Sequence, residues 1–296
     1  MHRALEVELT AQLRHGYPCN MKVILQLGLV IVLFVSQYAP ATSVPSSDCQ
    51  RQCGHIDMEY PFGIGPSCSL NGGFDINCSN QNGVSKPFIG DFELHSISIT
   101  EGTIRVLTGI RTYCYNTFTK LMDINTLTGF DGTDTPYRLS DIHNKFTVIG
   151  CSTLAYISGK GGRPYQSGCV STCSDMSDLV DGSCSGMGCC QTAIPKNMSY
   201  YVVGFDSGFN TSQIWMSTGR CSYAVLMEAD KFNFSTTYIN TTEFNDTNVG
   251  RAPMVLDWAL RDFPSCDTAK QNVTGTYACV SSNSVCVDSR NDNGYQ

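Results

Sequence analysis

Sixteen cysteines in 296 residues constrain this chain more than any other feature of its sequence. A cytosolic protein rarely carries so many thiols, because there they serve metal or redox chemistry, whereas in an oxidising compartment they form disulfides. Cys19 lies in an N-terminal leader, which leaves 15 cysteines in the rest of the chain, an odd number. We therefore expect an exported chain that is held together by disulfides and has one cysteine without an intramolecular partner.

The leader contains the one long apolar run of the sequence, residues 23–35. Its 13 residues fall short of the ~20 that a membrane-spanning helix needs. Lys22 precedes the run and small residues follow it up to Ser43, which is typical of a cleavable secretory signal. We predict a signal peptide within residues 1–43, with residues 1–20 as an N-terminal extension; an uncleaved signal anchor is the alternative. No second run of that length follows, so we expect a location outside the cell, in the wall or at the cell surface.

Acceptor sequons for N-linked glycans, Asn-x-Ser/Thr, support the prediction of export. One sequon is weak evidence in a chain rich in Asn, Ser and Thr, but five of them fall between residues 197 and 247. This density predicts a glycan-coated face. A further sequon at Asn77 has Cys78 as its middle residue, and a bridged cysteine would hinder access to it. The predicted glycosylation sites are Asn197, Asn210, Asn233, Asn240, Asn245 and Asn272.

Charge and motif content exclude several classes of function. Without the leader, 16 Lys and Arg face 24 Asp and Glu, so the net charge is −8 and the chain as a whole does not attract nucleic acid. No Gly-rich loop or Asp-Phe-Gly motif of a protein kinase occurs. Residues 182–186 imitate a nucleophile elbow around Cys184, but the neighbouring cysteines favour a disulfide there. The three histidines outside the leader lack ligand spacing. We predict no enzyme activity, no metal site and no cofactor.

Two consecutive segments, residues 49–150 and 151–265, show strand patterns without a convincing helical period. Residues 254–260 are the best candidate for either a short helix or a buried strand. At about 100 residues each, the segments can bury a modest core that disulfides supplement. The predicted fold class is therefore mainly β, with two small disulfide-rich β-domains followed by a partial module over residues 266–296.

Two local patterns refine this prediction. Apolar residues alternate on both sides of a Glu101-Gly102 turn, which predicts a β-hairpin over residues 97–106. Cys189 and Cys190 are adjacent, and neighbouring side chains of an extended chain point to opposite sides. A bond between these two neighbours would strain the backbone, so we expect each of them to bridge to a different segment.

Long cysteine motifs identify a family resemblance. The stretch CQRQCGHIDMEYPFGIGPSC at residues 49–68 resembles the galacturonan-binding domain of plant wall-associated receptor kinases. The stretches DGSCSGMGCCQTAIP at residues 181–195 and CSYAVLMEADKF at residues 221–232 resemble the next ectodomain segment of the same family. The resemblance covers roughly residues 49–296. It implies an extracellular, β-rich ectodomain that contacts pectin, in a family that signals through a membrane helix and a cytoplasmic kinase; residues 49–296 show no sequence pattern of either.

The C-terminal cysteines resemble the first half of an EGF-like module, with the sequence stopping at Gly294-Tyr295-Gln296, where a fourth cysteine is expected next. The first-to-third pairing of such modules implies a Cys266–Cys286 bridge and an unpaired Cys279. A sequence error or an intermolecular bridge is the alternative. Twelve cysteines remain upstream, an even number whose connectivity stays open. The predicted disulfide-bonded residues are Cys49, Cys53, Cys68, Cys78, Cys114, Cys151, Cys169, Cys173, Cys184, Cys189, Cys190, Cys221, Cys266 and Cys286.

The resemblance implies a polyanionic ligand, homogalacturonan, for which basic forks, a bridging Ca²⁺ and aromatic faces are the suitable contacts. Residues 49–150 contain seven basic and ten acidic residues, but the balance turns slightly positive between residues 85 and 120. The predicted carbohydrate-binding residues lie there: Lys86, Arg105, Arg111 and Lys120, with Tyr113 and Tyr115 as stacking residues.

Three hypotheses about function follow. The first is a non-catalytic ectodomain that binds pectin or oligogalacturonides. The second is a protein-interaction or decoy ectodomain that pairs with a receptor kinase and has no carbohydrate affinity. The third, a wall-polysaccharide hydrolase, would need two facing carboxylates, and the sequence does not show whether such a pair exists.

Overall fold

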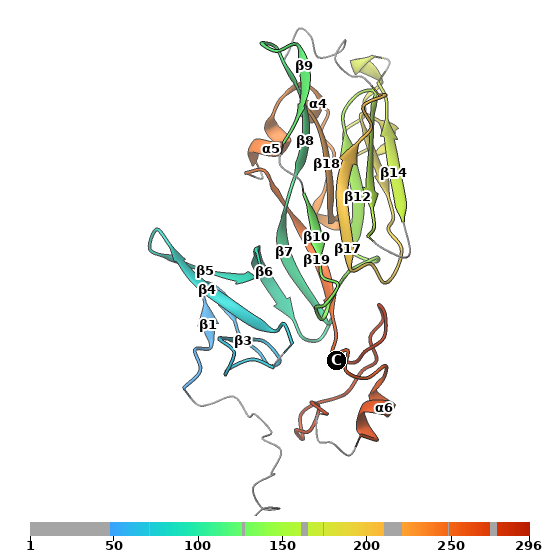
Figure 1. The fold of residues 1–296 in the computed structure, drawn as a ribbon. Helices are drawn as coiled ribbons and strands as arrows, with labels where there is room; N and C mark the ends of the chain where they lie inside the picture. Colours follow the sequence, from blue (N-terminus) through green and yellow to red (C-terminus); the bar gives the residue numbers. More distant parts are fainter. Residues whose placement is uncertain are drawn as a thin grey trace, which may run out of the picture. The chain divides into compact units, whose positions relative to one another are not determined.

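The computed structural model describes residues 48–70, 72–125, 128–160, 165–173, 175–209, 221–247, 249–272 and 277–296. The predicted signal peptide within residues 1–43 lies outside these ranges, as does the sequon residue Asn210. Among the described residues, no helix is long and apolar enough to cross a membrane. The described part of the chain is mainly β, as the sequence predicts (Figure 1).

The strands form three larger sheets and one small hairpin within the described ranges. The seven-stranded sheet has the order β11 (Tyr137–Leu139), β19 (Arg251–Trp258), β7 (Thr103–Gly109), β6 (Phe92–Ser98), β5 (Val84–Ile89), β4 (Asp75–Gln81) and β3 (Gly63–Ile64). The six-stranded sheet has the order β15 (Ser185–Met187), β16 (Cys189–Thr192), β12 (Asn144–Ile149), β18 (Cys221–Glu228), β8 (Arg111–Asn116) and β9 (Leu121–Ile124). The four-stranded sheet has the order β10 (Gly129–Asp131), β17 (Tyr200–Phe205), β13 (Thr153–Ser158) and β14 (Gln166–Ser171). The hairpin joins β1 (Gln52–Cys53) and β2 (Ile56–Asp57).

Within the ranges that the structure describes, helical structure is limited to single turns between or after the strands. The turns are η1 (Met176–Asp178), η2 (Ala229–Lys231), α4 (Thr237–Asn240), α5 (Glu243–Thr247) and α6 (Cys266–Lys270). Residues 254–260, for which the sequence left a short helix or a buried strand open, form a buried strand through Trp258, because they belong to β19, which lies between β7 and β11. The predicted hairpin over residues 97–106 is confirmed: β6 pairs with β7 so that Ile97 lies opposite Ile104.

Strand pairing crosses the predicted domain boundary at residue 150. β7 pairs along its whole length with β19, which lies far away in the sequence (Figure 1). β8 pairs with β18, and β12 lies between β18 and β16. Residues 49–150 and 151–265 therefore contribute strands to common sheets, and the described residues fall within one compact unit, residues 43–296.

Two apolar clusters hold the sheets together. In the larger one, the rings of Phe62, Phe74 and Trp258 meet edge to face, with centroids 5.3 to 5.9 Å apart. Phe62 belongs to the YPFGIG stretch, and a Cβ on the next residue, Gly63, would lie 2.0 Å from the carbonyl oxygen of Cys68, so the motif serves packing. The smaller cluster packs Phe244 and other side chains of the short helices against the six-stranded sheet. Burial of each large apolar side chain contributes about 1.5–3 kcal/mol.

Seven disulfides join the fourteen cysteines that the sequence analysis selected. The pairs are Cys49–Cys68, Cys53–Cys78, Cys114–Cys221, Cys151–Cys173, Cys169–Cys190, Cys184–Cys189 and Cys266–Cys286. The neighbours Cys189 and Cys190 bond to different segments, as expected from the alternation of side chains in a strand. Among the described cysteines, Cys279 alone is free.

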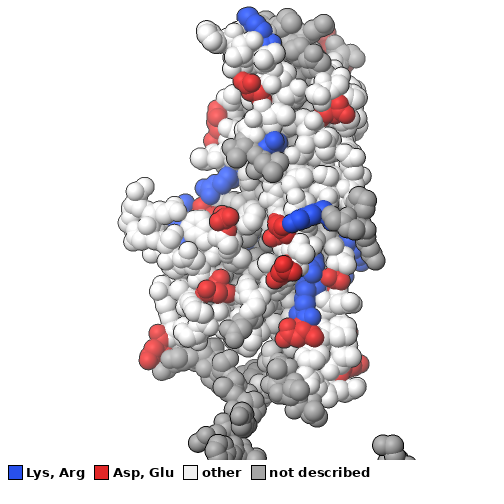
Figure 2. Space-filling view, viewed as in Figure 1, with Lys and Arg blue, Asp and Glu red and all other residues white. Residues whose placement is uncertain are grey.

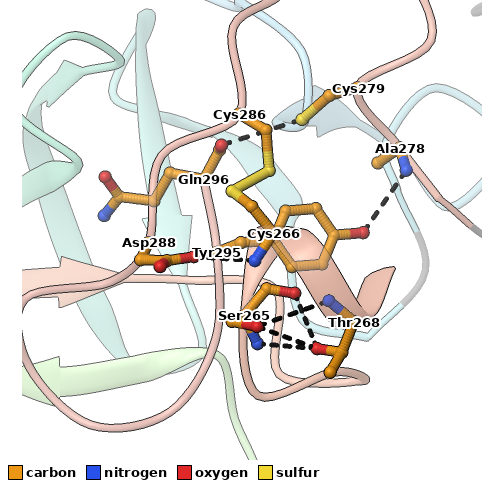
Figure 3. Close-up of a disulfide and its surroundings, with 9 residues drawn as sticks. All are labelled: Ser265, Cys266, Thr268, Ala278, Cys279, Cys286, Asp288, Tyr295 and Gln296. Atoms are coloured by element: carbon orange, nitrogen blue, oxygen red, sulfur yellow. Dashed lines mark hydrogen bonds between the residues drawn. A yellow bond between two sulfur atoms is a disulfide. The ribbon is translucent and has the colours of Figure 1, made fainter. Parts of the chain in front are cut away.

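The C-terminal residues pack against the edge of the seven-stranded sheet. Tyr295 is fully buried and its backbone pairs with Leu260, while Gln296 donates a hydrogen bond of 2.6 Å to the carbonyl oxygen of Trp258. Within this segment, the Cys266–Cys286 bridge lies beside the thiol of Cys279, whose Sγ is 3.7 Å from the carbonyl oxygen of Gln296 (Figure 3).

Candidate functional site

Two of the four basic residues predicted to bind carbohydrate are neutralised by carboxylates. Lys86 Nζ lies 2.9 Å from a carboxylate oxygen of Glu93, whose other oxygen lies 2.6 Å from Arg251 Nη1. Arg105 Nε lies 2.9 Å from Glu228, a side chain that is 5% exposed. We call these five residues the ion-pair cluster. Their charges pair within the protein, so Lys86 and Arg105 do not present free cations.

The other two predicted bases belong to a different sheet. Arg111 opens β8, and two nitrogens of its guanidinium are shielded from solvent without a hydrogen bond to any described residue. This burial lowers the pKa of Arg111 from its ordinary value. Lys120 is exposed in the turn between β8 and β9. The structure therefore does not gather the four bases into one patch, and on the face seen in Figure 2 basic and acidic side chains are interspersed.

The two predicted stacking residues are buried, which corrects the sequence-based assignment. Tyr113 is 8% exposed and stacks on Phe205, with ring centroids 5.2 Å apart and planes at 26°. Tyr115 is 4% exposed in the smaller apolar cluster. A sugar ring therefore cannot stack on the ring of either tyrosine. Both tyrosines alternate inward along β8, and the sequence pattern alone does not show which side of a strand faces the core.

A groove of about 640 Å³ lies on the side of the seven-stranded sheet opposite to the ion-pair cluster. Successive residues of a strand point to opposite faces of the sheet. Phe92 therefore lines the groove while its neighbour Glu93 belongs to the ion-pair cluster. In the same way, Val106 lines the groove and its neighbour Arg105 belongs to the cluster. The lining residues are Gly73, Asp75, Ile89, Gly90, Asp91, Phe92, Val106, Gly129, Phe130, Asp131, Thr135, Tyr137, Tyr200, Tyr201, Val202 and Leu256.

Short elements of two sheets place the polar and aromatic side chains at this groove. Asp75 is the first residue of β4, and Gly90-Asp91 is the two-residue turn between β5 and β6. Gly90 has φ +55°, the left-handed conformation that such tight hairpin turns require. Across the groove, β10 pairs with β17, so that Phe130 lies opposite Tyr201.

Buried tyrosines form a rigid, uncharged floor. The hydroxyl of Tyr137 donates a hydrogen bond of 2.8 Å to the carbonyl oxygen of Gly73, and burial raises the pKa of Tyr137 far above its ordinary value. The hydroxyl of Tyr201 lies 3.3 Å from that of Thr108, and burial raises the pKa of Tyr201 to about 12. Both phenols therefore stay protonated under physiological conditions.

The rim of the groove combines carboxylates with half-exposed rings. Asp131 accepts hydrogen bonds from Thr133 and forms an ion pair of 3.1 Å with Lys160, and these contacts lower the pKa of Asp131. The ammonium group of Lys160 also lies over the ring of Tyr200, 5.4 Å from its centroid. Phe92 is half-buried, with its ring centroid 5.6 Å from that of Phe130. Such a mixture of apolar rings and a few polar groups is typical of small-ligand sites.

The sequence analysis missed this site because its members are scattered. Phe92 lies inside the region of residues 85–120, but that region was chosen for its charge and not for its aromatic residues, and Tyr200 lies in the segment 151–265, for which the sequence predicted only strands. The structure also brings together two histidines that look isolated in the sequence: the rings of His55 and His95 meet with centroids 6.0 Å apart. Groups of three or more potential metal ligands do not occur among the described residues.

The predicted glycosylation sites that the structure describes are accessible. Asn197, Asn233 and Asn240 are exposed, and Asn245 and Asn272 are half-buried. None of the five lines the groove. Glycans at these positions would therefore attach outside the groove.

Comparison with known proteins connects the chain to one family. Residues 49–108 match the family "Wall-associated receptor kinase galacturonan-binding". Wall-associated receptor kinase 2 of Arabidopsis thaliana is 32% identical over 282 residues, which is 93% of this chain and 35% of that protein. Wall-associated receptor kinase 1 of the same species is 32% identical over 93% of this chain and 36% of its own length. No solved structure matches. The chain thus resembles wall-associated receptor kinases along most of its length, and it spans about a third of the length of these relatives.

Proposed function

We propose that this chain, a relative of the wall-associated receptor kinases, is a non-catalytic extracellular module that binds pectin. The observation that carries the proposal is the match of residues 49–108 to the galacturonan-binding family. This matched segment supplies one side of the groove, including Asp75, Asp91 and Phe92. Seven disulfides and exposed glycosylation sequons agree with an oxidising, extracellular environment.

The groove is the site that we assign to the carbohydrate. Its volume of about 640 Å³ accommodates a short stretch of a sugar chain. Carboxylates accept hydrogen bonds from sugar hydroxyls, and the half-exposed rings of Phe92 and Tyr200 offer apolar faces to the C–H groups of a pyranose. The exposed Lys120, in the turn between β8 and β9, marks the competing basic surface.

The test uses the glycosylated secreted protein and oligogalacturonides of defined length in isothermal titration calorimetry. We expect binding, a loss of about tenfold in affinity for Tyr200→Ala, and little change for Lys120→Ala. Dextran sulfate serves as a polyanion control for non-specific attraction. Absence of binding to any pectin fragment contradicts the proposal. If only Lys120→Ala lowers the affinity for oligogalacturonide, the binding site lies at the basic surface and not in the groove.

A second function, pairing with a receptor-kinase ectodomain, is favoured by one exposed apolar patch. Phe118 is 93% exposed in the turn between β8 and β9, and Leu121 and Ile124 of β9 are 64% and 45% exposed. Apolar side chains grouped on a surface strand are typical of protein contacts. Capture of a purified wall-associated receptor-kinase ectodomain by the wild-type chain and its loss in Phe118→Asp would support this function. Equal capture by both proteins would contradict the assignment to this patch.

A further inference from the structure

The rings of His55 and His95 form a pair of potential metal ligands outside the groove. Their centroids are 6.0 Å apart, and the ring planes are inclined at 69°. Both residues are exposed, and neither imidazole makes a hydrogen bond or an ion pair with another described residue. Neither histidine lines the groove. The pair is therefore open to solvent, and its ring nitrogens are available to an ion.

The hairpin that carries His55 holds it in place. His55 and Gly54 form the two-residue turn between β1 and β2. A Cβ on Gly54 would lie 2.6 Å from the carbonyl oxygen of Ser85, so the turn packs closely against β5. The disulfide of Cys53 ties the residue before the turn to β4, and Ile56, which follows the turn, is buried in the larger apolar cluster. His55 therefore projects from a backbone that is fixed on both sides.

His95 lies in a β-bulge of β6. The pairing of β6 with β7 shifts between Leu94 and Ser96, and His95 is the extra residue, without a partner on β7. Bulges re-aim side chains and are frequent beside functional sites. From this position the ring of His95 meets that of His55, which belongs to a different hairpin. Two defined backbone features therefore bring the two imidazoles together.

The separation of the rings fits two imidazoles that bind one ion. A ring nitrogen binds Zn²⁺ at about 2.0–2.1 Å, which places each ring centroid about 3 Å from the ion and the two centroids about 5–6.5 Å apart. The observed distance of 6.0 Å lies within this range. The χ2 torsion of histidine has broad energy minima, so two exposed rings can turn a nitrogen toward a shared ion at little cost.

The chemistry of the two ligands selects the class of ion. Imidazole nitrogen suits Zn²⁺, Ni²⁺ and Cu²⁺, and Cu²⁺ binds most strongly in this series. Ca²⁺ and Mg²⁺ prefer oxygen ligands. Groups of three or more His, Cys, Asp or Glu residues that could hold an ion do not occur in the part of the chain that the structure describes. Water or an outside ligand would therefore complete the coordination.

We propose that His55 and His95 bind a divalent transition-metal ion, Cu²⁺ most tightly, through one imidazole nitrogen each. The juxtaposition of the two rings carries the proposal: both are exposed, and a disulfide-tied turn and a β-bulge place them at the spacing that one ion requires. This site is independent of the proposed pectin-binding function, and its test uses no carbohydrate.

The experiment titrates Cu²⁺ into the glycosylated, untagged chain in isothermal titration calorimetry. Every protein carries Cys279→Ser, because a free thiol is itself a metal ligand. We expect Cu²⁺ to bind and Ca²⁺ to give no binding heat. His55→Gln and His95→Gln should each lower the affinity for Cu²⁺ at least about tenfold, because one imidazole lacks the gain from two linked ligands. His143→Gln, which changes the third histidine outside the leader, is the matched control and should leave the affinity within about twofold.

Several results would overturn the proposal. Absence of Cu²⁺ binding does so directly. Unchanged affinity in both His55→Gln and His95→Gln places the ion elsewhere, and a loss in only one of them shows a single ligand instead of a shared site. Electron paramagnetic resonance of Cu²⁺ on the protein with both histidines decides the case in which a variant fails to fold. Coupling to two imidazole nitrogens is the expected spectrum, and coupling to one or none contradicts the shared site.

Discussion

The two faces of the seven-stranded sheet carry opposite arrangements of charge. On one face, Lys86, Arg105 and Arg251 each contact a carboxylate within 3 Å, so the positive charges are consumed inside the protein. On the other face, Asp91 borders a groove and makes no ion pair with another described residue. One sheet therefore presents a self-neutralised surface and an open acidic one, although both faces come from the same strands.

This difference shows that the charge balance of a segment does not measure the charge that it offers to a ligand. Residues 85–120 are slightly basic as a stretch of sequence. The carboxylate of Glu228 and the guanidinium of Arg251 come from outside this stretch and complete the ion pairs. Lys86 and Arg105, which the sequence suggested as contacts for a polyanion, are therefore paired with carboxylates within the protein.

The largest expected effect comes from breaking the ion-pair cluster at its buried end. Arg105→Ala leaves Glu228 as a buried charge without its partner, and we expect a loss of about 3 kcal/mol in the free energy of unfolding. Chemical denaturation with the disulfides intact measures it. Lys86→Ala is the control, because Glu93 keeps Arg251 as a partner and the loss should stay below about 1 kcal/mol. Equal losses of unfolding free energy in Arg105→Ala and Lys86→Ala would contradict the conclusion that the buried ion pair of Arg105 with Glu228 contributes more to stability.

A smaller effect is expected from the pH dependence of the same face. Burial raises the pKa of Glu93, but hydrogen bonds and charges from Lys86 and Arg251 outweigh burial and lower it below its ordinary value. A lowered folded-state pKa gives stability that is present above the unfolded-state pKa and is lost as the pH falls through the folded-state pKa. We expect Glu93→Gln to cost about 1 kcal/mol at neutral pH and to cost progressively less as the medium is acidified below about pH 4. Unfolding midpoints across this pH range provide the measurement, and a constant cost would refute the ion-pair explanation.

The smallest effect belongs to the exposed ion pair at the groove. Lys160 and Asp131 are largely exposed, so their contact adds little to stability, and Lys160→Ala should leave the thermal unfolding midpoint unchanged. The same variant removes a cation from the rim of the groove, and the affinity for oligogalacturonide should fall by about twofold. A clear drop in the unfolding midpoint would show that the exposed pair of Lys160 and Asp131 stabilises the fold, as the pairs of the ion-pair cluster do, and would contradict this prediction.

Local patterns predicted much of the fold and little of the site. The hairpin over residues 97–106 follows from alternation around a turn, which is a local property. The buried state of Tyr113 and Tyr115 depends on which face of β8 meets the core, and this is decided by the pairing of β8 with β18 over a hundred residues later. Phe92 and Tyr200 form the groove rim only because β5, β6, β10 and β17 meet there.

The sequence by itself determined the chemistry of the chain: a β-rich, disulfide-stapled fold, the set of cysteines that pair, and a resemblance to wall-associated receptor kinases. These properties depend on residue types and short spacings. The tertiary structure alone decided which charges are neutralised and which stay open, because the deciding contacts join residues far apart, such as Arg105 with Glu228 and Arg251 with Glu93. Coulomb attraction depends on distance in space, and distance along the chain does not reveal it.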